Sequence, residues 1–92
     1  MKDISQILKA PSTVVVDVRT PEEYSGGHVA GSINIPLNEV PHRLEELKIM
    51  SNIVLCCASG GRSMQACMYL KQNGIDSMDG GPWTNVNYLK NN

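Results

Sequence analysis

The clearest shortage in this 92-residue sequence is of aromatic side chains, with no phenylalanine, one tryptophan and three tyrosines. The core must therefore be aliphatic, built from valine, isoleucine, leucine and methionine. The net charge is also small, −1 at pH 7, so we expect neither a nucleic-acid partner nor binding to an anionic membrane. No apolar run approaches the roughly 18 residues that a membrane-spanning helix needs.

The length fits a single domain over residues 1–92. Residues 1–9 carry charge throughout and lack the apolar segment of a signal peptide, so we expect a cytoplasmic protein. The three cysteines match no zinc-binding spacing, and both histidines lie far from them in the sequence. We therefore expect reduced thiols, no metal and no organic cofactor.

Short aliphatic runs bounded by turn residues predict four extended segments, at residues 13–18, 33–35, 52–56 and 75–78. Apolar residues at helical spacing predict helices over residues 3–9, 20–25, 37–47, 63–73 and 83–89, with a break at Pro41 and a turn at 80–82. Strands that alternate with helices indicate an α/β domain with a mostly parallel sheet.

The second helix has a recognisable start, with Thr20 as N-cap, Pro21 in the first position and Glu23 completing a capping box. We expect Glu23, like the other glutamates on the predicted helices, to lie on a solvated face. Trp83 is expected to cover the core rather than to bind a substrate.

The chemistry centres on residues 53–63, where a buried strand leads through small residues into a helix. Ligands of parallel sheets bind beyond the carboxyl ends of the strands. Small loop residues let successive backbone N–H groups converge on an anion. The helix N-terminus and Arg62 both stabilise a thiolate. This pattern predicts a nucleophilic cysteine.

Spacing alone leaves two cysteines open as the nucleophile. Five residues separate Cys56 from Arg62, which is the Cys-x5-Arg spacing of cysteine phosphatases, whereas four separate Cys57 from Arg62. The first interpretation predicts a phosphatase or an arsenate reductase that uses Cys56. The second leaves room for one terminal sulfur atom and predicts a persulfide on Cys57.

Three motifs occur in order along the chain: Asp17-Val18-Arg19 with residues 21–24 and 27–36, then residues 57–63, then Asp79-Gly80-Gly81. With these motifs the sequence resembles a single-domain rhodanese, a sulfurtransferase. The resemblance implies a rhodanese-like α/β fold with a five-stranded, mostly parallel sheet and helices on both faces. It implies Cys57 as the catalytic, persulfide-forming residue. It also implies a substrate-binding loop formed by Ala58, Ser59, Gly60, Gly61, Arg62 and Ser63.

The same resemblance implies that sulfur passes from thiosulfate or another persulfide donor to cyanide, a thiol or a protein acceptor. The alternative is a non-catalytic sulfur carrier or regulatory module. Asp17, Arg19 and His28 are expected to support the site structurally rather than to react.

Two departures from the family pattern have consequences. Ala58 stands where thiosulfate-using members often have a basic residue, so only Arg62 and Arg19 remain to attract an anionic donor. Trp83 follows Gly81 after a single residue, so we expect a local rearrangement in the last helix.

Overall fold

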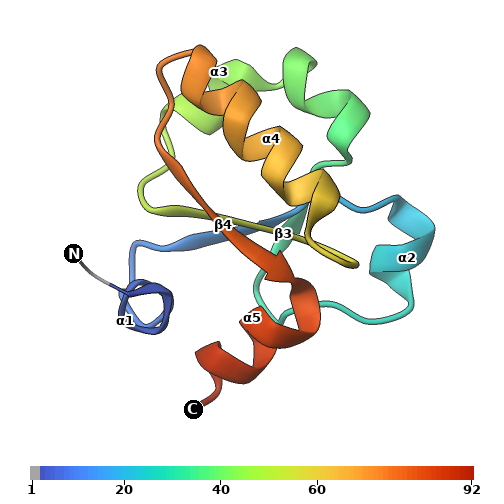
Figure 1. The fold of residues 1–92 in the computed structure, drawn as a ribbon, viewed down its shortest axis with the longest axis vertical. Coiled ribbons are helices and arrows are strands. Elements are labelled where there is room, and N and C mark those ends of the chain that lie inside the picture. Colours follow the sequence, from blue (N-terminus) through green and yellow to red (C-terminus); the bar gives the residue numbers. More distant parts are fainter. Residues whose placement is uncertain (1–2) are drawn as a thin grey trace.

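The computed structural model describes residues 3–92 and folds them around one parallel sheet (Figure 1). The strands are β1 (Val14–Asp17), β2 (Ile33–Asn34), β3 (Ile53–Cys57) and β4 (Ser77–Pro82). Their spatial order is β2-β1-β3-β4, and each neighbouring pair is parallel. The helices are α1 (Ile4–Leu8), α2 (Pro21–Ser25), the 3-10 helix η1 (Leu37–His42), α3 (Leu44–Lys48), α4 (Gly61–Gln72) and α5 (Trp83–Lys90).

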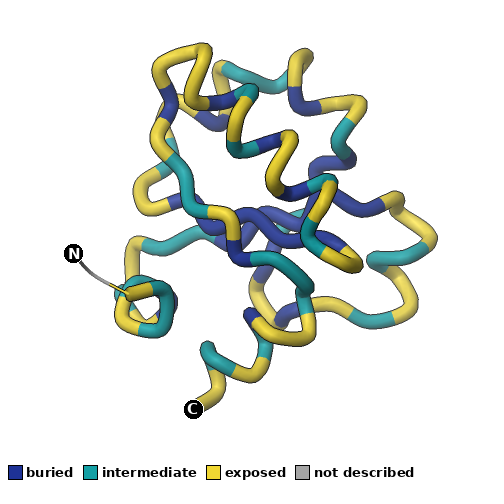
Figure 2. Tube along the Cα trace, in the orientation of Figure 1, coloured by how far each residue is buried: buried dark blue, intermediate teal, exposed yellow. Residues whose placement is uncertain are grey.

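Helices cover both faces of this sheet, as expected for an α/β domain. Elements η1, α3 and α4 lie on one face, while α1 and α5 lie on the other (Figure 1). Figure 2 shows the central strands as the buried middle of the molecule, with exposed residues along the outer sides of the helices. Strand β3 is buried along its whole length, because its side chains alternate between two apolar layers. None of the helices within residues 3–92 is long and apolar enough to cross a membrane.

The expectation of five strands is wrong for the described residues, which form a four-stranded sheet. The fifth strand came from the family resemblance alone, since the residue patterns predict only four extended segments. Near the N-terminus, Ile4 and Ile7 pack as part of α1 against the second face of the sheet instead of pairing with an edge. At the other edge, β2 is only two residues long, and Pro36 just beyond it has no N–H to continue the ladder.

Strand β4 begins and ends later than predicted, and it absorbs the turn expected at residues 80–82. The cause is the close approach of Gly80 to β3. A Cβ atom at Gly80 would lie 2.9 Å from the carbonyl oxygen of Leu55 and 2.7 Å from a methyl group of Val86. Only glycine allows β4 to lie this close, so the paired glycines extend the strand toward the end of β3.

Candidate active site

The active-site candidate lies where β3 ends and α4 begins. Cys57 is the last residue of β3, and its side chain belongs to the apolar layer beneath α4. The backbone N–H of Gly60 donates a hydrogen bond to the Cys57 Sγ at 2.9 Å. Gly60 has a φ of +107°, in the left-handed region that favours glycine. This conformation turns the chain back over the sulfur and leads directly into α4.

The surroundings of Cys57 favour its thiolate form. Burial by itself raises the pKa of Cys57. The Ser63 hydroxyl and the backbone amides of Ser63, Gly60 and Ser59 outweigh burial, so the pKa lies below its ordinary value. The Sγ–Oγ distance between Cys57 and Ser63 is 3.4 Å. These donors come from the loop and the first turn of α4, as the sequence pattern predicts.

Cys56 lies one residue earlier and faces the opposite apolar layer. Burial is the main reason that its pKa is raised to about 12, and the nearby Asp17 carboxylate raises it further. At neutral pH the Cys56 thiol therefore stays protonated. The two spacings left open by the sequence thus correspond to two thiols of opposite character.

Asp79 reaches this site although sequence reasoning assigned it no role. The Ser63 hydroxyl donates a hydrogen bond to Asp79 Oδ1 at 2.6 Å, and the Gly81 N–H donates to the same oxygen at 3.0 Å. Asp79 therefore connects the middle of β4 to the serine that contacts Cys57. The only sequence signal was its place beside the paired glycines of the third motif.

Arg62 is held by Glu23 on α2, a helix that lies beside the loop (Figure 1). Both terminal nitrogens of Arg62 donate to the carboxylate, at 2.7 Å and 3.0 Å. The Glu23 side chain is 37% exposed, so it lies on a solvated face as predicted, but its ion pair with Arg62 was not predicted. Chiefly because Arg62 donates to it, the Glu23 carboxyl has its pKa lowered to about 2. The pair spans 39 residues of sequence, so no local pattern could have found it.

Asp17 and Arg19 form a buried ion pair at the end of β1. Arg19 Nε donates to the Asp17 carboxylate at 3.0 Å, and Arg19 NH2 donates to it at 2.8 Å. Arg19 also donates to the Gly27 carbonyl at 2.7 Å and lies 4.9 Å above the Trp83 ring. Arg19 is 5% exposed, so the expectation that it attracts an anionic donor is wrong. Trp83 begins α5 and packs in the layer beneath this pair.

His28 is held at the end of α2 and not against the reactive loop. Its Nδ1 lies 2.7 Å from the Tyr24 carbonyl oxygen, and the two rings stack with centroids 3.8 Å apart. The Tyr24 hydroxyl in turn donates to the Ser32 carbonyl at 2.6 Å. The Tyr24 hydroxyl thus ties α2 to the segment before β2, and His28 packs on the same tyrosine. The organising role of His28 stays a prediction.

The substrate-binding loop of the sequence analysis is only partly turned toward the thiol. Ala58, Ser59 and Gly61 are exposed, whereas Ser63 is buried and Cys57 is 0% exposed.

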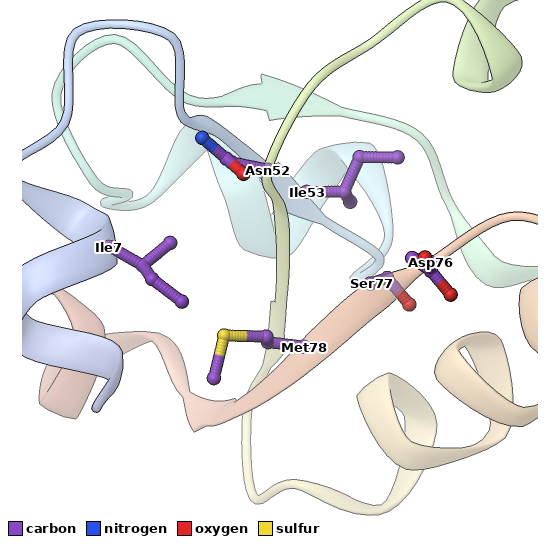
Figure 3. A pocket seen from close by; sticks show the side chains of 6 residues that line it. All are labelled: Ile7, Asn52, Ile53, Asp76, Ser77 and Met78. Atoms are coloured by element: carbon purple, nitrogen blue, oxygen red, sulfur yellow. The ribbon is translucent and has the colours of Figure 1, made fainter. Parts of the chain in front are cut away.

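A hollow of about 140 Å³ lies at the other end of the strands from this loop, where β3 and β4 begin (Figure 3). It is lined by Ile7, Asn52, Ile53, Asp76, Ser77 and Met78. The described residues contain no cluster of three or more histidine, cysteine, aspartate or glutamate side chains arranged to hold a metal.

The geometry thus defines an α/β domain with a thiol of lowered pKa at the carboxyl end of a central strand. The rhodanese-like domain family matches residues 1–90, and the chain belongs to this family.

Three relatives illustrate the similarity. A sulfurtransferase of Allochromatium vinosum is 39% identical over 61 residues, which are 66% of this chain and 57% of that protein. The thiosulfate sulfurtransferase GlpE of Pseudoalteromonas translucida is 32% identical over 79 residues, covering 83% of this chain and 75% of that protein. The crystal structure of a rhodanese-like domain protein from Staphylococcus aureus superposes with a TM-score of 0.77 at 29% identity, covering 89% of this chain and 80% of that one.

The chain therefore spans little more than half the length of the first of these relatives. Its family and its named relatives support a sulfurtransferase-type enzyme.

Proposed function

We propose that the protein transfers a sulfane sulfur through a persulfide on Cys57. The observation that carries this proposal is the buried Cys57 Sγ, which accepts the Gly60 N–H at 2.9 Å at the start of α4. A single terminal sulfur on Cys57 would extend into the same set of backbone donors. Preorganised amides of this kind stabilise an anionic sulfur without any reorganisation during the reaction.

The proposed reaction has two steps. The Cys57 thiolate attacks the outer sulfur of the donor, and the bond that held this sulfur breaks. The leaving group takes the electron pair, as sulfite does when thiosulfate is the donor. A thiol or cyanide then attacks the outer sulfur of the persulfide and releases the Cys57 thiolate. Residues 58–63 form the loop around the transferred sulfur. Asp17, Arg19 and His28 do not react but hold the end of β1, α2 and the segment after α2 in place.

Partners of this reaction are a small-molecule sulfur donor and a thiol, cyanide or protein acceptor. We place the reaction in the cytoplasm, where thiols are kept reduced. A phosphatase reaction on Cys56 would need an ionised thiol, and the raised pKa of Cys56 opposes this. A sulfur-carrier role would use the same persulfide and would show fast transfer from a protein persulfide but slow turnover with small donors.

Mass spectrometry after incubation with thiosulfate or a hydropersulfide tests the proposal. We expect a mass gain of about one sulfur atom on the peptide containing Cys57, removable by cyanide or dithiothreitol. A gain located on Cys56, or no gain with either donor, would contradict it.

A further inference from the structure

The positive charges around the reactive loop are already neutralised within the chain. Arg62 is bound at both terminal nitrogens by Glu23, and Arg19 is bound by Asp17 in the protein interior. Ala58 contributes no charge, and the Asp79 carboxylate lies one hydrogen bond beyond Ser63. A small dianion that approaches Cys57 therefore finds both arginines already paired with carboxylates of the chain, and the Asp79 carboxylate close by. This arrangement weakens electrostatic attraction for thiosulfate.

Glu23 is fixed in place before any donor arrives. Its Oε1 accepts the backbone N–H of Thr20 at 3.0 Å, while the Glu23 N–H donates to the Thr20 hydroxyl at 3.3 Å. This capping box orders the carboxylate that binds Arg62, so less side-chain entropy is lost when the ion pair forms. An exposed ion pair between two free side chains would be worth little. A preordered, bidentate partner competes more effectively with an incoming anion.

Building on the proposed function, we propose that Glu23 sets the donor specificity of the site. By occupying Arg62 it selects against small sulfur oxyanions and favours hydropersulfides carried by a thiol compound of low charge. Glu23 acts through Arg62 and is a specificity-determining residue, not a catalytic one.

The favoured step balances without an oxidant. The Cys57 thiolate attacks the outer sulfur of R–S–SH, and a bond forms between Sγ and that sulfur. The R–S–SH sulfur–sulfur bond breaks, and its electron pair leaves with the thiolate R–S⁻. The proton stays on the transferred sulfur, which gives Cys57–S–SH. One sulfur–sulfur bond replaces another, so no net oxidation or reduction occurs.

The central variant is Glu23→Gln, because glutamine keeps the capping acceptor and removes the charge. We expect kcat/KM for thiosulfate to rise about tenfold when Arg62 is released from the carboxylate. The value for 2-hydroxyethyl hydropersulfide should stay within about twofold, because its neutral form gains little from a free cation. Added salt should lower thiosulfate kcat/KM more steeply in this variant than in the native chain.

Glu22→Gln is the matched control, since this exposed glutamate has the same charge and lies next to Glu23 in the first turn of α2, whereas the ion pair of Arg62 is made with Glu23. The double variant Glu23→Gln with Arg62→Gln should lose the gain. Circular dichroism checks that each variant is folded.

Three results would overturn the inference. The first is unchanged thiosulfate kcat/KM in folded Glu23→Gln, the second an equal rise in Glu22→Gln, and the third a gain that survives removal of Arg62. In each of these cases a persulfide on Cys57 would leave the proposed function standing. If neither donor places sulfur on Cys57 in any variant, both the function and the inference fail.

Discussion

Cys56 and Cys57 are neighbours in one strand and are both 0% exposed, yet they have opposite acid–base character. Burial raises the pKa of Cys56 to about 12. Burial also acts on Cys57, but hydrogen bonds from Ser63 and the loop amides bring its pKa below the ordinary value. The alternation of a strand places the two thiols on opposite faces of the sheet. Within residues 3–92, Cys57 Sγ has hydrogen-bond partners on the face under α4, and Cys56 Sγ has none.

The comparison shows that zero exposure does not by itself set the pKa of a thiol: Cys56 is the more deeply buried of the two, and Cys57 also receives hydrogen bonds. Cys56 packs among aliphatic side chains such as Val15 and Val54, which offer it no donor. Cys57 lies against a loop whose left-handed Gly60 and helical start turn N–H groups inward. A thiolate is therefore stabilised by oriented backbone dipoles in a place where bulk water cannot solvate it.

The largest expected effect is a loss of sulfur transfer when Cys57 is substituted, compared with no loss when Cys56 is substituted. Cys57→Ser should reduce persulfide formation and sulfur transfer to background, because the nucleophilic sulfur is lost. Cys56→Ser should retain both, because this thiol stays protonated and lies in the other apolar layer. The measurement is the sulfur adduct by mass spectrometry together with cyanide-dependent turnover.

Stability provides the control for this pair. A hydroxyl at position 56 is buried among apolar side chains, so Cys56→Ser is expected to cost about 1–3 kcal/mol of folding free energy. Thermal unfolding separates this loss from a loss of chemistry. A folded Cys56→Ser protein without activity, beside an active Cys57→Ser protein, would reverse the assignment of the nucleophile.

The next effect concerns the donors that make Cys57 different. Ser63→Ala should raise the pKa of Cys57, since the hydroxyl that lowers it is removed. Persulfide formation below the new pKa should slow severalfold, because a smaller fraction of Cys57 is thiolate. Thiolate absorbance measured against pH reports the shift. Ser51→Ala, at an exposed position before β3, is the control and should leave the titration curve unchanged. A Cys57 pKa that does not move would remove Ser63 from the account.

Much of this site could be predicted because its determinants are local in the sequence. The aliphatic run of β3, the small loop residues and the helical spacing after them place a thiol at a helix start without any tertiary information. The capping box of Thr20 and Glu23 was also predicted, and both of its hydrogen bonds are present.

The contacts that sequence reasoning missed all join segments far apart in the chain. Glu23 meets Arg62 only because α2 lies beside the loop after β3, and Asp79 meets Ser63 only because β4 pairs with β3. The length of β4 was missed for the same reason. From the sequence alone, Gly80 is predicted to be a turn residue. Its place in β4 depends on strand pairing, which brings the carbonyl of Leu55 close to it. Helical spacing and strand runs describe single elements, whereas these contacts depend on which elements become neighbours.

The smallest expected effect is a larger difference between the pKa values of the two cysteines, produced by a change at Asp79. The Ser63 hydroxyl donates to Asp79 Oδ1 at 2.6 Å and lies 3.0 Å from the Gly60 carbonyl oxygen, while its own oxygen accepts the Cys57 thiol. Once Cys57 is a thiolate, its sulfur competes with these two acceptors for the single Ser63 proton. Asp79→Asn weakens this competing bond and removes a negative charge near the thiolate, so the pKa of Cys57 should fall further. The titration of thiolate absorbance measures the change.

Asp76→Asn is the matched control, because it removes the same charge from an exposed position before β4 begins, at the other edge of the sheet. Its Cys57 titration should match that of the native chain. A higher Cys57 pKa in Asp79→Asn would show that Asp79 matters mainly because its charged hydrogen bonds to the Ser63 hydroxyl and the Gly81 N–H hold these groups beside the loop. In that case the carboxylate would stabilise the thiolate by positioning Ser63, and its own charge would be the weaker influence.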